Sequence, residues 1–176
     1  MSQGITPEFI LGYRAMMLDG IAREAELTKK VLAAVPDDKS DYRPDPHART
    51  ARELASHIVS ADISFLDGIA DLAFGMEGDK QFATTAETVA SYDENMKRGI
   101  ARVSEMTADQ LMTPVNFFNV FNLPAVFYLG FLNNHSIHHR GELAVYLRPM
   151  GSKCPSIYGG SYDEPFQMPE TTQSAA

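Results

Sequence analysis

Four stretches of this chain carry apolar residues at helical spacing, and each begins with a signal that starts a helix. The first follows Thr6–Glu8, which combines an N-cap residue with a proline at the first helical position, and it extends to Val35 before Pro36. Apolar residues three and four positions apart share one face of an α-helix, so this pattern predicts a helix with one buried face. The dominant periodicity of the chain therefore predicts an all-α protein.

The second and third stretches each open on a capping-box sequence. Thr50–Glu53 precedes a predicted helix whose apolar stripe ends before Gly75, and Thr84–Glu87 precedes a predicted helix that runs to about Met106. The fourth predicted helix begins near Asn122 and runs to Arg148, where a proline and a glycine follow.

The remaining segments are predicted to be short or irregular. Residues 107–110 start one further short turn, and residues 113–121, rich in β-branched and aromatic side chains, are expected to be extended or irregular. Residues 152–176 are expected to form an ordered but irregular tail. We expect a single domain over residues 1–170, a frayed tail over residues 171–176, and a four-helix bundle whose packing order the pattern leaves open.

Histidines are the residues of this chain that most strongly suggest chemistry. His135 and His139 lie four positions apart on the last predicted helix, so they share one face and can reach a single divalent metal ion. His138 is an alternative partner for His135, but His139 shares its face with Glu142. A third ligand must come from elsewhere, and His57, about 85° off the apolar stripe of its own predicted helix, is a candidate.

Two other residues receive simpler interpretations. His47, between two prolines and the cap of the second predicted helix, is expected to be exposed in a loop. Cys154 is the only cysteine and is predicted to be a small packed residue rather than a nucleophile, because no histidine or aspartate stands near it in sequence.

Three imidazole ligands suit Zn²⁺ or Ni²⁺ and leave at least one coordination position open for water or substrate. Because imidazoles are neutral, they leave the double positive charge of the ion uncompensated, which predicts affinity for an anion such as a thiolate. Glu142 is the nearest carboxylate on the histidine face, and its role is open between acid–base catalysis, orientation of a ligand and a place on the helix surface.

Three sequence segments together resemble a known family. They are Glu53-Leu-Ala-Ser-His57-Ile, then His135-x-x-His138-His139-Arg140-Gly-Glu142, and Pro155-x-x-Tyr158-Gly159. The combination resembles the DinB (DNA-damage-inducible) superfamily from the first helix to about Gly159. The resemblance implies a four-helix bundle, often dimeric, with one divalent metal held by residues that map onto His57, His135 and His139.

The resemblance also implies a class of activity. Characterised members of the superfamily include transferases and isomerases that use a low-molecular-weight thiol such as bacillithiol or mycothiol. We therefore expect a metal-dependent, thiol-using enzyme that acts on a small molecule. A metal-dependent hydrolase, or a non-catalytic metal-containing protein that binds a ligand in a stress response, would use the same residues.

Charge and composition limit the classes of partner and the cellular compartment that we expect for this chain. The net charge of −8 and the absence of a basic cluster argue against nucleic acid. No run of 18 apolar residues and no signal peptide is visible, so we expect no membrane partner and a cytoplasmic protein, which the single cysteine fits. A homodimer is expected, because long helix faces with exposed Met and Phe residues favour isologous pairing.

Overall fold

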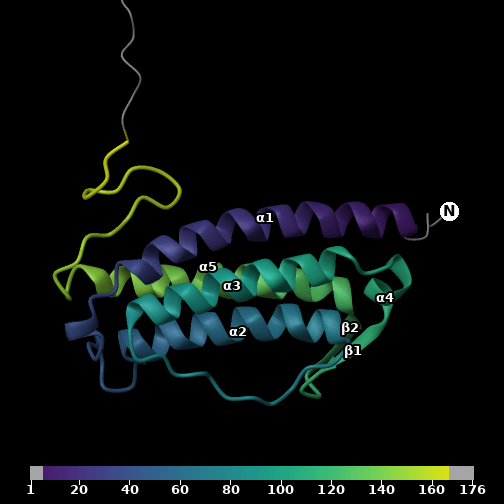
Figure 1. Ribbon diagram of the computed structural model, residues 1–176, viewed down its shortest axis with the longest axis horizontal. Coiled ribbons are helices and arrows are strands. Elements are labelled where there is room, and N and C mark those ends of the chain that lie inside the picture. The colour runs from purple at the N-terminus through teal and green to yellow at the C-terminus, as the bar shows by residue number, and fades with distance from the viewer. Residues whose placement is uncertain (1–5, 167–176) are drawn as a thin grey trace, which may run out of the picture.

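The computed structural model describes residues 6–166, and this part of the chain is mostly helical (Figure 1). In chain order its elements are α1 (Pro7–Ala33), η1 (Asp37–Lys39), α2 (Ala51–Asp71), α3 (Thr85–Ser104), α4 (Ala108–Met112), β1 (Pro114–Phe117), β2 (Phe121–Pro124), η2 (Ala125–Phe127) and α5 (Tyr128–Leu147). Residues 152–166 form an irregular segment, as expected. The predicted frayed tail, residues 171–176, lies outside the described residues.

The helix starts follow the capping sequences. The side chain of Thr50 accepts a hydrogen bond from the Glu53 backbone N–H, and Glu53 accepts one from the Thr50 backbone N–H, which completes the capping box. At α3 only half of the box forms: Thr84 caps Glu87, but the Glu87 carboxylate accepts from the backbone of Ala83 instead. In both helices the threonine side chain accepts from a backbone N–H group of the first turn, which has no acceptor within the helix itself.

The last long helix begins later than its sequence predicts. Residues 121–124 form β2, which pairs antiparallel with β1 from Pro114↔Pro124 to Phe117↔Phe121. The Tyr128 hydroxyl donates to the Val115 carbonyl at 2.7 Å and accepts from the Leu123 backbone N–H at 3.2 Å, which fastens this hairpin to the start of α5. The helix therefore spans 20 residues, and the hairpin is an exception to the all-α expectation.

The four long helices pack against one another around a shared apolar core (Figure 1). Helix α1 contacts α3 and α5, and α2 contacts the same two helices. Helices α2 and α3 run in the same direction, so the connection between them, residues 72–84, has to return along the length of α2. This return places Asp79 of the loop beside His57, in the second turn of α2.

A glycine permits the close approach of α2 and α3. A Cβ atom added at Gly99 would lie 2.7 Å from the Leu66 Cβ, closer than real Cβ atoms approach one another. Leu66 is completely buried, so it has no free space into which to move. The α2–α3 interface is thus built around the missing side chain of Gly99.

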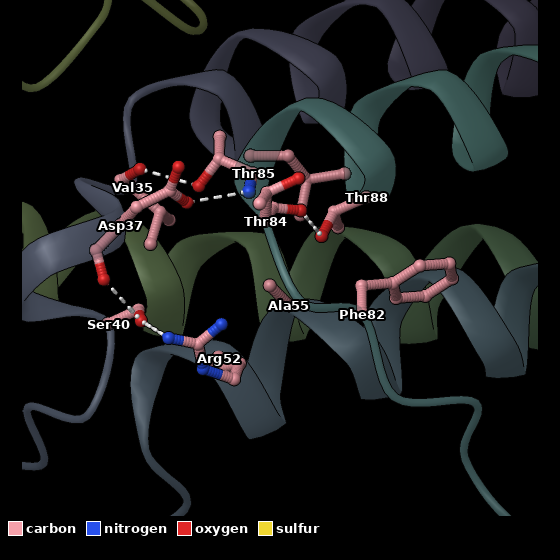
Figure 2. A pocket seen from close by; sticks show the side chains of 10 residues that line it. Val35, Asp37, Ser40, Arg52, Ala55, Phe82, Thr84, Thr85 and Thr88 are labelled. Carbon is pink, nitrogen blue, oxygen red and sulfur yellow. Dashed lines mark hydrogen bonds between the residues drawn. The ribbon is translucent and has the colours of Figure 1, made fainter.

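The start of α3 is tied to the turn that follows α1 (Figure 2). The Asp37 carboxylate accepts from the Thr85 backbone N–H at 2.7 Å, and the Thr85 hydroxyl donates to the Val35 carbonyl at 2.8 Å. Arg52, on α2, donates to the Ser40 hydroxyl. The hollow between these residues has a volume of about 10 Å³, enough for at most a single water molecule, so it is a structural junction and not a substrate site.

Within residues 6–166, no helix is both long enough and apolar enough to span a lipid bilayer.

Candidate metal centre

Packing of α2 against α5 brings three histidines together. His57 projects from α2, and His135 and His139 project from successive turns of α5. The ring centroids of His57 lie 5.0 Å from His135 and 4.8 Å from His139, and those of His135 and His139 lie 4.6 Å apart. One nitrogen from each ring falls within 4.8 Å of the others, so the trio could hold one metal ion.

Each of the three imidazoles also contacts a different carboxylate through its Nδ1 atom. The Nδ1 of His57 lies 3.0 Å from Asp79, in the α2–α3 connection, and that of His139 lies 3.0 Å from Glu142. The Nδ1 of His135 lies 3.3 Å from Asp62. A neutral imidazole whose Nδ1–H donates to a carboxylate presents the lone pair of its Nε2 atom, which is the form that binds a metal.

The carboxylate behind His135 is itself held by a buried tyrosine. Asp62 is completely buried, and its second oxygen accepts a hydrogen bond from the Tyr92 hydroxyl at 3.1 Å. Burial, together with the charge of Asp62, raises the pKa of Tyr92 well above its ordinary value. Tyr92 therefore keeps its proton and remains a donor to Asp62.

The protonation of two of the histidines favours metal binding at neutral pH. Burial, reinforced by the positive charge of Arg49, lowers the pKa of His57 despite the opposing effect of Asp79. Burial likewise lowers the pKa of His139, although its hydrogen bond to Glu142 acts in the other direction. Both imidazoles are consequently neutral and able to donate a lone pair.

The chemistry of the donor atoms fits a cation between the rings. The Nε2 atoms of His57 and His135 face each other at 3.1 Å. When both Nδ1 atoms carry the proton, two lone pairs meet across this gap with no hydrogen between them, and a positive ion relieves their repulsion. At metal–nitrogen distances of 2.0–2.1 Å, two ligand nitrogens of a tetrahedral zinc site are about 3.3 Å apart, close to the observed separation.

The other candidate residues lie outside this trio, although two of them adjoin His139. His138 is exposed, and with His139 and Glu142 it forms a second group that could hold a metal, but Glu142 already contacts His139 there. His47 is exposed in the loop before α2, as predicted, and Cys154 is partly buried in the segment after α5. Glu142 accepts from Tyr146 at 3.2 Å as well as contacting His139 at 3.0 Å.

Sequence reasoning missed Asp62 and Asp79. Asp62 carries a detectable signal, because it is an acidic residue five positions after His57 in a mostly apolar helix, and a buried carboxylate requires a partner. Asp79 carries none, because it stands in a loop between Gly78 and Lys80 and only the return path of the chain places it beside His57.

Comparison with known proteins establishes the family. The model of the DinB family matches residues 1–172. The chain belongs to the DinB family. This DinB protein is 30% identical over 144 residues to YrdA, an uncharacterised protein of Bacillus subtilis, which covers 80% of this chain and 85% of the relative.

Solved structures agree with that assignment. A DinB-like protein from Bacillus cereus superposes with a TM-score of 0.70 at 29% identity, over 81% of this chain and 95% of the other. The DinB-like protein YjoA of Bacillus subtilis superposes with a TM-score of 0.65 at 21% identity, over 81% and 96% of the two chains, and this likeness concerns the fold alone.

A second polar cluster lies on the side of α5 opposite the candidate metal centre of this DinB protein. Arg140 is buried to 1% exposure, and its guanidinium pairs with the Glu24 carboxylate at 2.6 Å and donates to the Glu24 carbonyl. The hydroxyl of Tyr158, beyond α5, accepts from Arg140 and donates to Glu24 at 2.6 Å. This cluster joins α1, α5 and the C-terminal segment on the side of α5 away from the histidines.

Proposed function

We propose that this DinB protein binds one divalent metal ion, zinc or nickel, through His57, His135 and His139, in a scaffold that is a four-helix bundle of α1, α2, α3 and α5. The observation that carries the proposal is the geometry of the histidines. Three imidazoles converge, each contacts a carboxylate through its Nδ1 atom, and two of their Nε2 atoms face each other at 3.1 Å.

The carboxylates change the balance expected at this site between metal binding and anion binding. Asp62, Asp79 and Glu142 bring three negative charges within hydrogen-bond distance of the histidines. These charges offset the double positive charge of the ion, contrary to the expectation from the imidazoles alone. They also make the imidazoles better electron donors. The arrangement therefore supports tight metal binding more strongly than it supports capture of an anion.

We further propose that the site is catalytic, and that the protein uses a low-molecular-weight thiol to modify a small molecule by transfer or isomerisation. When bound, the ion would supply Lewis acidity to a group at the positions that the protein leaves open. Family resemblance supports the thiol, and the 15–20% exposure of the three histidine side chains supports access from solvent. Hydrolysis, and ligand binding without turnover, are the alternatives that use the same residues.

Metal content tests the first proposal. Purified protein is expected to contain about one divalent ion per chain by plasma mass spectrometry. His57→Ala, His135→Ala and His139→Ala are each expected to lose it, because two imidazoles hold such an ion poorly. His138→Ala is the matched control and is expected to retain the metal. If His138→Ala loses as much metal as His139→Ala, the ligand assignment on α5 is wrong.

Cobalt substitution tests the second proposal. Addition of bacillithiol, mycothiol or glutathione to the Co²⁺ protein is expected to produce sulfur-to-metal charge-transfer absorption, and His135→Ala is expected to show none. Turnover of an ester or amide without any response to a thiol would favour the hydrolase. The absence of both would favour a ligand-binding protein without turnover.

A further inference from the structure

A pocket opens beside the histidines, between α2, the α2–α3 connection and the β1–β2 hairpin. We call it the aromatic pocket, and its walls include Ser64 and Phe65 of α2, Phe74 and Glu77 of the connection, and Phe117 and Phe118 of the hairpin. Its volume is about 150 Å³, room for one benzene-sized ring, and its lining combines four phenylalanine rings with two serines and two acidic side chains.

Phenylalanine rings form one continuous wall of the pocket. Phe65 and Phe117 stack with centroids 5.6 Å apart and planes only 8° from parallel. Phe74 meets both rings edge-on, at 6.0 and 4.9 Å. Such a wall presents apolar surface and negatively polarised ring faces, which favour an aromatic group or a cation.

The backbone is arranged to hold two of these rings in place. A Cβ added at Gly68 would lie 2.3 Å from the Phe74 ring, so the ring packs directly against the α2 backbone. Phe118 has a φ of 51° and Asn119 one of 59°, a left-handed conformation that costs about 1–2 kcal/mol per non-glycine residue. Two hydrogen bonds between Asn116 and Asn119, at 2.8 and 3.0 Å, stabilise this turn.

The charge of the pocket is negative. Glu77 and Asp79 both line it, and no lysine, arginine or histidine of residues 6–166 does. Asp79 is already engaged by His57, so Glu77 is the carboxylate left to meet a ligand. A carboxylate beside an aromatic wall repels anions and attracts a positively charged group.

The pocket also adjoins the candidate metal centre. Asp79 contacts the Nδ1 of His57 at 3.0 Å, and the Phe65 ring lies 5.9 Å from the His135 ring. Asp79 and Phe65 thus belong both to the wall of the pocket and to the surroundings of the histidines.

We propose that the aromatic pocket binds the substrate of this protein, and that the substrate carries an aromatic ring on a protonated amine. The ring lies against Phe65, Phe74 and Phe118, and the ammonium group pairs with Glu77. The ligand class follows from the lining alone, whereas the role as substrate rests on the proposed metal-dependent function.

Calorimetric titration of chelator-treated protein tests the ligand class without metal. The probes are 2-phenylethylamine, 2-phenylethanol and phenylacetate, which share the ring and differ in charge. The amine is expected to bind about tenfold more tightly than the alcohol, because it adds an ion pair and a cation–π contact, and phenylacetate is expected to bind most weakly. Phenylacetate binding as tightly as the amine would overturn the proposal.

Paired variants locate the site. Phe118→Ala and Glu77→Gln are each expected to weaken amine binding by about fivefold to tenfold. Phe121→Ala is the control, since Phe121 is an equally exposed ring of the same hairpin, at 42% against 41% for Phe118, and packs instead on Phe131. Equal losses for Phe118→Ala and Phe121→Ala would show that the amine binds elsewhere.

Paramagnetic NMR separates this inference from the metal proposal. In Co²⁺-loaded protein, the protons of bound 2-phenylethylamine are expected to show shifts that vanish in His139→Ala. Amine binding to a protein that takes up no metal would refute the metal site and leave the ligand class standing. Binding of both without such shifts would refute the role of the pocket as the substrate site.

Discussion

Asp62 links the buried core of the protein to the candidate metal centre through its hydrogen bonds. It is completely buried, contacts the Nδ1 of His135 and accepts from Tyr92. A buried carboxylate is costly unless it is paired, and its two hydrogen-bond partners here are uncharged when His135 is neutral. The charge of Asp62 is therefore better explained by a cation beyond His135 than by the stability of the fold.

Asp62→Asn separates those two explanations. The amide retains the size of the side chain and can still accept from His135, but it removes the charge. Metal affinity, measured by competition with a chelator, is expected to fall about tenfold to 100-fold. The free energy of unfolding of the metal-free variant, measured in urea, is expected to equal or exceed that of the metal-free wild type, because a buried charge has been removed.

Asp67→Asn is the control on the same helix, because Asp67 pairs with Arg98 and Arg102 of α3 and is remote from the histidines in its contacts. It is expected to leave metal affinity unchanged. A loss of metal affinity in Asp67→Asn as large as that in Asp62→Asn would mean that α2 responds to any loss of charge, and the specific role of Asp62 would be refuted.

The convergence of the three histidines was predictable from the sequence, but the side chains around them were not. His135 and His139 share a helix face because of their spacing, and resemblance to the family favoured His57, already a candidate, as their partner. The contacts of Asp79 and of the aromatic pocket depend on how residues 72–84 return along α2. Helical periodicity does not specify that path.

At the scale of elements, two helical glycines offer a matched test of packing, because an added methyl group would meet a neighbouring side chain at one and open space at the other. Gly99→Ala on α3 forces a methyl group against the buried Leu66, and overpacking of this kind costs about 1–3 kcal/mol. Gly12→Ala on α1 meets no atom within 4 Å and is expected to stabilise the protein by about 0.5–1 kcal/mol, through helix propensity. Urea unfolding measures both.

Whether each substitution raises or lowers the free energy of unfolding tests this packing. If Gly99→Ala were neutral or stabilising, α2 and α3 would not approach as closely as described. A destabilising Gly12→Ala would instead indicate a contact to the exposed face of α1 that arises outside the single chain.

The junction between η1 and α3 predicts a dependence of stability on pH. The Thr85 backbone N–H lowers the pKa of Asp37, and burial opposes this only weakly. A carboxyl group whose pKa is lower in the folded state contributes stability above its unfolded pKa, here 3.8, and loses it as the pH falls through the folded value.

Asp37→Asn is accordingly expected to be less stable than wild type at pH 6–7, with the difference shrinking as the pH falls below about 4. Asp38→Asn is the neighbouring control, because the Asp38 carboxylate makes no side-chain hydrogen bond or ion pair within residues 6–166. Unfolding free energies measured across this range decide the matter. A difference between wild type and Asp37→Asn that stays constant with pH would show that the contact to Thr85 carries no charge dependence.

Elements were predictable where local chemistry decides them. Threonine caps start α2, α3 and α4 where the sequence predicts. The start of α5 was misplaced, because residues 121–124 form β2 through pairing with residues 114–117 and through the hydroxyl of Tyr128. The end of α2 was predicted to within one residue, but its cause was not, since Leu72, and neither of the glycines that follow, adopts the left-handed conformation at the helix end.

At the scale of the whole molecule, polar contacts stabilise the face of α5 that points away from the histidines. The Arg140–Glu24 pair is buried on the side of Arg140, and Tyr158 closes it from the C-terminal segment. Adjacent residues of the family motif therefore have different roles: His139 faces the candidate metal centre, whereas Arg140 faces α1 and forms a polar contact with it.

The outer surface of α1 carries the strongest indication of assembly. Phe9 and Met16 are seven residues apart, so they lie on one face of the helix, and their exposures are 61% and 63%. Exposed apolar side chains on one helix face favour association with a second copy, and a symmetric pair of α1 helices would bury them.

We predict a homodimer with a mass by light scattering of about twice the 19.4 kDa of one chain. A double variant, Phe9→Asp with Met16→Asp, is expected to shift the mass toward that of one chain, because the dimer would bury unpaired charges. Met76→Asp is the control, since Met76 is 87% exposed in the α2–α3 connection and away from this face. A wild-type mass near 19.4 kDa at micromolar concentration would contradict the dimer, and a dimer that survives the double variant would place its interface elsewhere.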